Sequence, residues 1–246
     1  MTATAPYGLN TVPIQRADFE YLYNEVRNTE GRSLTDGQVM LLPDIDALHP
    51  QYREWQYRKR SSQRLINYLT QKHKALNILE IGCGNGWLSY KMAQIPGTKV
   101  TGLDINNEEI AQAKRVFKKE NLHCIYNDFT PGLFGAEKFD IILCAASVSY
   151  FPSLTNLVQQ ALSCLGADGE FHIMDTHFYK TDEVSPAKKR MQDYYDAMGY
   201  PEMSAHYHHY TLADMAGFNY SILVNPQNMM NRFIKAEPFY WIRIKN

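Results

Sequence analysis

The sequence has few cysteines, almost no net charge and no long hydrophobic run, and each of these features excludes a class of protein. Its 4 cysteines stand at spacings that match neither a zinc site nor a dense disulfide framework, so we expect buried, reduced thiols. A formal net charge of -1 offers no attraction to a phosphate backbone, so we expect no nucleic acid as a partner. The apolar run at residues 141–146 is far shorter than the roughly 18 residues that cross a bilayer, so we expect no membrane partner either.

The composition is that of a globular protein, with 45% hydrophobic and 21% charged residues among 246. Residues 1–10 have neither the basic region nor the apolar core of a secretory signal, and we expect a cytoplasmic protein. We place an N-terminal extension at residues 1–50, in which residues 31–50 form an extended loop, and one domain at residues 51–246.

Short apolar segments alternate with helical segments through the middle of the chain. The strands carry apolar residues without alternation, as expected where helices cover both faces of a parallel sheet. The pattern predicts an α/β fold with a doubly wound, mostly parallel seven-stranded sheet and helices on both faces, closed by a terminal antiparallel hairpin. Strands are expected at residues 75–81, 100–103, 123–126, 139–143, 170–174, 220–224 and 239–244, and helices at residues 52–70, 87–94, 107–119 and 153–165.

Residues 175–217 interrupt this alternation with a mostly helical, aromatic segment. We expect it to be a helical aromatic lid, inserted after the fifth strand, that walls a substrate pocket. The segment also contains four histidines, which are His177, His206, His208 and His209.

A glycine-rich turn follows the first strand in the segment Leu79-Glu80-Ile81-Gly82-Cys83-Gly84-Asn85-Gly86. Glycines permit left-handed backbone angles and let the backbone approach a ligand, and the helix start that follows presents free N–H groups. Asp104 ends the next strand, where a carboxylate can accept hydrogen bonds from both hydroxyls of a ribose. The combination predicts a nucleoside ligand.

Two kinds of nucleoside cofactor compete for this turn. A nicotinamide site requires Gly-x-Gly-x-x-Gly, but here the third glycine comes one residue early and Trp87 takes its place. Glu80 at the strand end suits a ligand with a cationic amine better than a pyrophosphate. A nicotinamide-dependent oxidoreductase and a nucleoside-binding regulatory or scaffold protein without turnover stay open as alternatives.

The segment from Glu80 to Gly86, followed by Asp104, resembles the first two motifs of the class I S-adenosylmethionine-dependent methyltransferases. Asn127-Asp128-Phe129 is similar to the adenine-edge site of that family, and residues 139–147 and 169–174 are similar to its fourth- and fifth-strand motifs. The resemblance implies methyl transfer with S-adenosyl-L-methionine as cofactor. The cofactor-binding residues that it implies are Glu80, Gly82, Cys83, Gly84, Gly86, Asp104, Ile105, Asp128, Phe129 and Ala145.

Arg58, on the helix expected before the sheet, is a further candidate that could pair with the carboxylate of the methionine moiety. It belongs to a short basic cluster, and solvation at the surface explains most clusters of this kind. A surface role for Arg58 is therefore the competing interpretation.

We expect a small-molecule methyl acceptor, with O-methylation preferred over N-methylation because several His and Tyr groups could handle a hydroxyl proton. His177 is the first candidate for a general base, and His206, His208 and His209 are further candidates. Packing is the competing role for all four. No acid or Cys stands at zinc-ligand spacing near them, so we expect no metal, and a homodimer stays open.

Overall fold

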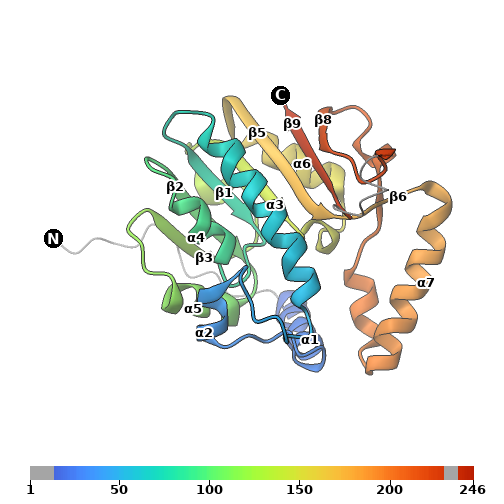
Figure 1. Ribbon diagram of the computed structural model, residues 1–246. Coiled ribbons are helices and arrows are strands. Elements are labelled where there is room, and N and C mark those ends of the chain that lie inside the picture. The colour runs from blue at the N-terminus through green and yellow to red at the C-terminus, as the bar shows by residue number, and fades with distance from the viewer. Residues whose placement is uncertain (1–13, 230–237) are drawn as a thin grey trace.

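The computed structural model describes residues 14–229 and 238–246, and it is built around one seven-stranded sheet (Figure 1). The strand order is β3-β2-β1-β4-β5-β9-β8, in which β9 runs antiparallel to both of its neighbours and the other pairs are parallel. The predicted fold class and closing hairpin are therefore confirmed. The strands are β1 (Asn77–Ile81), β2 (Lys99–Asp104), β3 (Leu122–Tyr126), β4 (Phe139–Ala145), β5 (Leu165–Thr176), β8 (Asn219–Val224) and β9 (Tyr240–Lys245).

Helices cover both faces of this sheet, with α3 (Tyr52–Thr70) and α4 (Trp87–Ala93) in front of it and α6 (Leu154–Ser163) behind it in Figure 1. Successive residues of β1 supply the two cores because side chains alternate along a strand. Ile78 belongs to the core with α3 and α4, and Leu79 to the core with α6. Among the helices of the described residues, none is both long and apolar enough to cross a membrane.

Side-chain caps fix where two of the helices begin. Ser153 caps α6, because its Oγ accepts a hydrogen bond from the backbone N–H of Asn156 at 3.2 Å. Asn106 caps α5 (Asn107–Val116) in the same way, by accepting from the N–H of Glu109 at 3.1 Å. The second cap places the start of α5 directly after the end of β2.

The segment after β5 is mostly helical, as expected, but it also contains a small sheet. Its elements are β6 (Phe178–Tyr179), α7 (Thr181–Met198), η3 (Pro201–His206), β7 (Tyr210–Thr211) and η4 (Leu212–Met215). The strands β6 and β7 pair in parallel, so the two ends of the helical excursion are held together. Figure 1 shows α7 standing beside the main sheet.

The chain before α3 is more ordered than its composition indicates. It forms α1 (Ile14–Thr29) and α2 (Asp36–Leu41), so the expected extended loop at residues 31–50 is wrong over α2. The reason is a capping box, in which Thr35 Oγ accepts from the N–H of Gln38 and Gln38 Oε1 accepts from the N–H of Thr35. Val39 and Leu42 are buried in the core that contains α3. Residues 1–10, judged to lack a secretory signal, lie outside the described residues.

The four cysteines are free thiols, as predicted. Cys83, Cys144 and Cys164 are buried, and Cys124 is partly exposed. Burial raises the pKa of the Cys144 thiol to about 12 and that of Cys124 to about 11. Neither thiol is therefore a nucleophile at neutral pH.

Candidate active site

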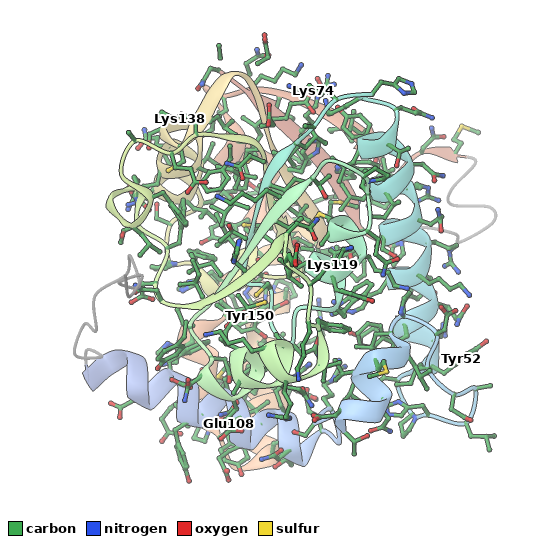
Figure 2. The ribbon with its side chains drawn as sticks, turned by 90° about the vertical axis from the view of Figure 1, so that its left-hand side faces the viewer. Tyr52, Lys74, Glu108, Lys119, Lys138 and Tyr150 are labelled. Atoms are coloured by element: carbon green, nitrogen blue, oxygen red, sulfur yellow. The ribbon has the colours of Figure 1, made fainter. Side chains whose placement is uncertain are left out.

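A cavity of about 330 Å³ lies at the carboxyl ends of β1, β2 and β4. Parallel strands bring these ends to one edge of the sheet, which is where open α/β sheets bind ligands. In Figure 2 Lys74 and Lys138 lie at the top of the view, and Tyr150 lies below them, near the middle of the molecule. The wall combines the glycine turn with side chains from α1, α3 and the loops after β2, β3 and β4. Its members include Phe19, Tyr23, Arg27, Arg32, Glu54, Trp55, Arg58, Glu80, Gly82, Cys83, Gly84, Asp104, Ile105, Glu109, Asn127, Asp128, Phe129, Ala145, Ser147, Tyr150 and Phe151.

The turn after β1 requires glycine at two positions for separate reasons of space. Gly82 has a φ of +75°, and a Cβ there would lie 2.4 Å from the Cβ of Ser147. Gly84 has a φ of +53°, and a Cβ there would lie 2.3 Å from Oε2 of Glu109. Both positions combine a left-handed backbone with a close approach. A larger residue at Gly82 would displace the loop at Ser147, and one at Gly84 would push aside the side chain of Glu109.

Asp104 is held at the cavity wall by backbone donors on both sides. Its Oδ2 accepts from the N–H of Gly84 at 2.7 Å, and its Oδ1 accepts from the N–H of Asn106 at 2.8 Å. Burial and the nearby Glu109 carboxylate raise the pKa of Asp104 to about 7. Each carboxylate oxygen keeps a further lone pair, so Asp104 can also accept from a ligand.

Glu80 is a second carboxylate of the same cavity, and it is buried, with only 2% of its surface exposed. Its Oε2 accepts from Ser89 Oγ on α4 at 2.5 Å, and burial raises its pKa to about 8. Within the described part of the chain, no Lys, Arg or His forms an ion pair with it. A buried carboxylate without a cationic partner favours a ligand that brings positive charge.

Glu109, on α5, is a third acid at this turn and was not predicted from the sequence. Burial raises its pKa, while Arg27 and Arg58 act in the opposite direction. The three carboxylates face the glycine turn from β1, β2 and α5, so the cavity is acidic on this side.

All of the predicted cofactor residues line the cavity except Gly86. Gly86 lies at the N-cap of α4 with a φ of +76°, and a Cβ there would lie 2.9 Å from the Cβ of Ala113 on α5. Gly86 therefore lets α4 and α5 pack closely against each other. Phe129 is nearly buried and also contacts the ring of Phe134, at a centroid distance of 6.5 Å.

Arg58 lines the cavity as well, but it already has an acidic partner. Its Nε and Nη2 donate to Oε1 of Glu54 at 3.1 and 2.9 Å, and its guanidinium lies 5.4 Å from the ring centroid of Trp55. Glu54 also accepts from Arg32 at 2.7 Å. A carboxylate ligand at Arg58 would therefore share the guanidinium with Glu54.

None of the four histidines is among the residues that line the cavity. The ring of His177 contacts that of Tyr179 at 4.3 Å, and His209 contacts the same tyrosine at 5.1 Å. The backbone N–H of His208 donates to the carbonyl of Ser149 at 2.7 Å. Burial lowers the pKa of His177, His208 and His209, so these imidazoles are neutral at pH 7 and able to accept a proton.

An aromatic series connects these histidines to the cavity. His209 contacts Tyr207 at 5.3 Å, and Tyr207 contacts Tyr150 in the cavity wall at 5.7 Å. His206 contacts Phe19 of α1 at 5.1 Å. No group of three or more His, Cys, Asp or Glu side chains in residues 14–229 and 238–246 is arranged to hold a metal ion.

The contribution of α1 was missed from the sequence. Phe19, Tyr23 and Arg27 of this helix line the cavity. The sequence does contain a signal for this helix. The apolar residues Phe19, Leu22, Tyr23 and Val26 recur at the spacing of one helix face. Applied to residues 14–29, this test would have predicted an amphipathic helix.

Two side chains of α1 fasten it over the cavity. Glu20 accepts from the backbone N–H of Asn107 at 2.6 Å and from the hydroxyl of Tyr126 at 2.7 Å. Asn24 accepts from the side-chain amide of Asn106 at 2.6 Å. The helix is thereby tied to the ends of β2 and β3.

One family profile matches the middle of the chain. The profile is described as "Methyltransferase domain", and it covers residues 78–169, from β1 into β5. The matched segment contains the glycine turn and the ends of β2, β3 and β4, and α1 and α3 lie outside it.

Curated relatives match overlapping stretches of the chain. A ubiquinone biosynthesis O-methyltransferase from Actinobacillus pleuropneumoniae is 32% identical over 114 residues, which cover 42% of this chain and 48% of the relative. A sterol 24-C-methyltransferase from Gibberella zeae is 24% identical over 173 residues, which cover 68% of this chain and 44% of the relative. The chain thus spans about half the length of the curated relatives it matches.

Solved structures match nearly the whole chain at low identity. A plantazolicin methyltransferase in complex with S-adenosylhomocysteine superposes with a TM-score of 0.55 and 18% identity, covering 96% of this chain and 100% of its own. A magnesium protoporphyrin IX methyltransferase from Synechocystis gives a TM-score of 0.57 and 16% identity, covering 95% and 99%. At such identities the likeness shows the fold alone.

The raised pKa of Glu80 predicts a pH-dependent stability for the ligand-free protein. The native pKa lies above the unfolded value, so this contribution is fully present below about pH 4.5 and is lost as pH rises through about 8. Between pH 6 and pH 8 the free energy of unfolding of the wild type should fall relative to Glu80→Gln, by up to about 2.7 kcal/mol at about 1.36 kcal/mol per pH unit. Urea unfolding of both proteins at the two pH values measures this difference. Equal changes in the two proteins would contradict it.

Proposed function

We propose that this chain is a class I S-adenosylmethionine-dependent methyltransferase, which transfers a methyl group from S-adenosyl-L-methionine to a small-molecule acceptor. The resemblance read from the sequence is confirmed by the matching profile and the methyltransferase relatives. The observation that carries the proposal is the pair of acids, the buried Glu80 and the half-buried Asp104, at the ends of adjacent strands on one glycine turn. This arrangement suits a ligand with a ribose and a positive charge.

The residues at the cavity wall fit this cofactor. All four acidic and aromatic candidates line the cavity, and in this proposal Asp104 accepts from the ribose hydroxyls, Asp128 and Phe129 contact the adenine, and Glu80 faces the cationic end. When bound, the cofactor supplies a methyl group on a positively charged sulfur atom. The protein's own part is to orient the acceptor in line with that methyl group, exclude water and hold the acceptor's proton.

A dinucleotide fits the same wall less well. Its pyrophosphate would lie on the glycine turn, where Glu80, Asp104 and Glu109 present three carboxylates. Repulsion between these groups and a pyrophosphate disfavours the nicotinamide-dependent oxidoreductase considered from the sequence. A scaffold protein that binds the cofactor without turnover is separated from the enzyme by the transfer assay below.

For the acceptor we propose a small molecule methylated on oxygen. The O-methyltransferases among the relatives support this choice, although a sterol C-methyltransferase is also among them. We place the acceptor between the cavity and residues 175–217, because Tyr150 in the wall contacts Tyr207 of that segment. In this proposal residues 51–246 form the methyltransferase domain, residues 175–217 are its lid, and the N-terminal extension of residues 1–50 contributes α1 to the wall.

The first prediction concerns the identity of the cofactor. Isothermal titration should show binding of S-adenosylmethionine and S-adenosylhomocysteine, and none of NAD or NADP at comparable concentration, because the acidic wall accepts positive and not negative charge. Binding of NAD without binding of S-adenosylmethionine would overturn the proposal.

The second prediction concerns Asp104. Asp104→Asn should weaken S-adenosylmethionine binding by about 10- to 100-fold, since it removes the charge from a hydrogen-bonded contact of about 1.5–3 kcal/mol. Asp168→Asn is the matched control, because Asp168 is exposed and far along β5 from the cavity, and it should leave the affinity unchanged. Thermal melts of both variants check folding. Equal affinity in the Asp104 variant and the wild type would remove Asp104 from the binding site.

The third prediction concerns the general base, which we propose among the histidines of residues 175–217. A screen of phenols, hydroxy acids, sugars and amines first identifies an acceptor. His177→Gln, or the joint replacement of His206, His208 and His209, should then slow transfer by roughly 100-fold with little change in cofactor affinity. Unchanged rates in both variants would make these histidines packing residues.

A further inference from the structure

Three polar groups on one wall of the cavity have no polar partner within the described residues. They are the hydroxyls of Tyr23 and Tyr150 and the guanidinium of Arg27, and all three residues line the cavity. Arg27 Nε is buried without a hydrogen bond. The guanidinium carbon lies 5.7 Å from the ring centroid of Tyr23, and that ring lies 5.6 Å from the ring of Tyr150. The three side chains therefore form one cluster.

Arg27 differs in this respect from the other two arginines of the cavity wall. Arg58 donates twice to Glu54, and Arg32 forms ion pairs with Glu54 at 2.7 Å and Glu30 at 3.1 Å. For Arg27 the described residues offer no carboxylate within ion-pair distance. An arginine keeps its charge in proteins. Arg27 is half-buried, and the carboxylates of Glu109 and Glu30 act on its charge only from beyond ion-pair distance. The N–H groups of its guanidinium are therefore available to an anion from outside the chain.

The donor geometry indicates which anion this is. A guanidinium presents a planar fork of N–H groups that matches the two oxygens of a carboxylate, and each tyrosine hydroxyl adds a single donor. The surrounding wall is aromatic, because Phe19 lies 5.8 Å from Tyr150 and 5.9 Å from Tyr23 between ring centroids. Such a wall suits the planar ring of an aromatic carboxylic acid.

The cluster also lies on the acceptor's side of the cavity. Tyr150 contacts Tyr207, and α1 contacts η3, so the cluster borders the segment to which the proposed function assigns the acceptor. Tyr23 and Arg27 lie outside residues 78–169, the stretch that the methyltransferase profile matches. Acceptor recognition is expected outside that stretch, because the cofactor motifs are inside it.

We propose that Tyr23, Arg27 and Tyr150 form a carboxylate-binding subsite for the methyl acceptor, which is then an aromatic carboxylic acid. This inference rests on the proposed function and deepens it. The carboxylate is held by α1 at the cavity wall, and the ring lies against the aromatic side chains there.

The test uses protein saturated with S-adenosylhomocysteine and four aromatic acids, each paired with its neutral primary amide. The acids are benzoate, 4-hydroxybenzoate, 3,4-dihydroxybenzoate and cinnamate, titrated calorimetrically. At least one acid should bind the wild type more tightly than its amide. Arg27→Gln should weaken that acid by about 10- to 100-fold and leave the amide unchanged, and Arg27→Lys should recover part of the loss. Tyr23→Phe and Tyr150→Phe should each cost about 2- to 10-fold.

Arg60→Gln is the matched control, because Arg60 is an exposed arginine on α3 outside the cavity wall, and this variant should bind the acid like the wild type. Thermal melts establish that every variant folds. The inference is overturned if no acid binds the wild type better than its amide, or if Arg27→Gln weakens acid and amide equally.

A second arm identifies the source of the carboxylate, because the cofactor's amino-acid end also carries one. S-adenosylhomocysteine and 5′-methylthioadenosine share the nucleoside thioether, and only the former has the carboxylate. If Arg27→Gln weakens the former tenfold or more and spares the latter, the cluster serves the cofactor and the acceptor assignment is wrong. A wild type that binds neither compound overturns the proposed function and this inference with it. Failure of the acids alone overturns only this inference.

Discussion

The gathering of three poorly solvated carboxylates around one glycine turn is the constraint on which the rest of this structure depends. Glu80, Asp104 and Glu109 approach the turn from β1, β2 and α5, and burial raises the pKa of each. Charges held this close in a poorly solvated place repel one another, so the ligand-free protein keeps some of them protonated. Arg27 and Arg58 lower the pKa of Glu109, and they belong to α1 and α3, two helices that line the cavity. The charge at the turn is therefore coupled to these helices.

The sheet supplies the geometry that this constraint needs. Strands β1, β2 and β4 are parallel neighbours, so the residues that follow them meet at one edge. Ser147, after β4, donates its hydroxyl to the carbonyl of Ile81 at 2.7 Å and packs against Gly82. Ala146 and Asp175, at the ends of β4 and β5, hold φ angles of +59° and +52°, which L residues rarely adopt. Such strain persists where surrounding contacts fix the backbone, and it gathers at functional edges.

Local patterns in the sequence were sufficient to predict the strands of the seven-stranded sheet, the glycine turn and the position of Asp104 at a strand end. These features depend on residues near one another in the chain, such as an apolar run that ends in glycines. The role of α1 was not predicted, because Tyr23 and Arg27 reach the turn only through long-range packing. The histidines were predicted to wall a pocket, but their position depends on the path of the 175–217 segment, which pairs β6 with β7 and turns their rings toward tyrosines.

Proton release on cofactor binding tests the central claim most directly, namely that the buried carboxylates receive a positively charged nucleoside. Titrations of S-adenosylmethionine at pH 6.5 in two buffers of different ionisation enthalpy give the number of protons exchanged. Without ligand, Glu80 and Asp104 largely hold their protons at this pH, because their pKa values are raised to about 8 and about 7. The account predicts a release of roughly one proton or more on binding, since a cationic ligand favours the ionised acids, and a smaller release in Glu80→Gln. Binding without proton release, or with proton uptake, would contradict it.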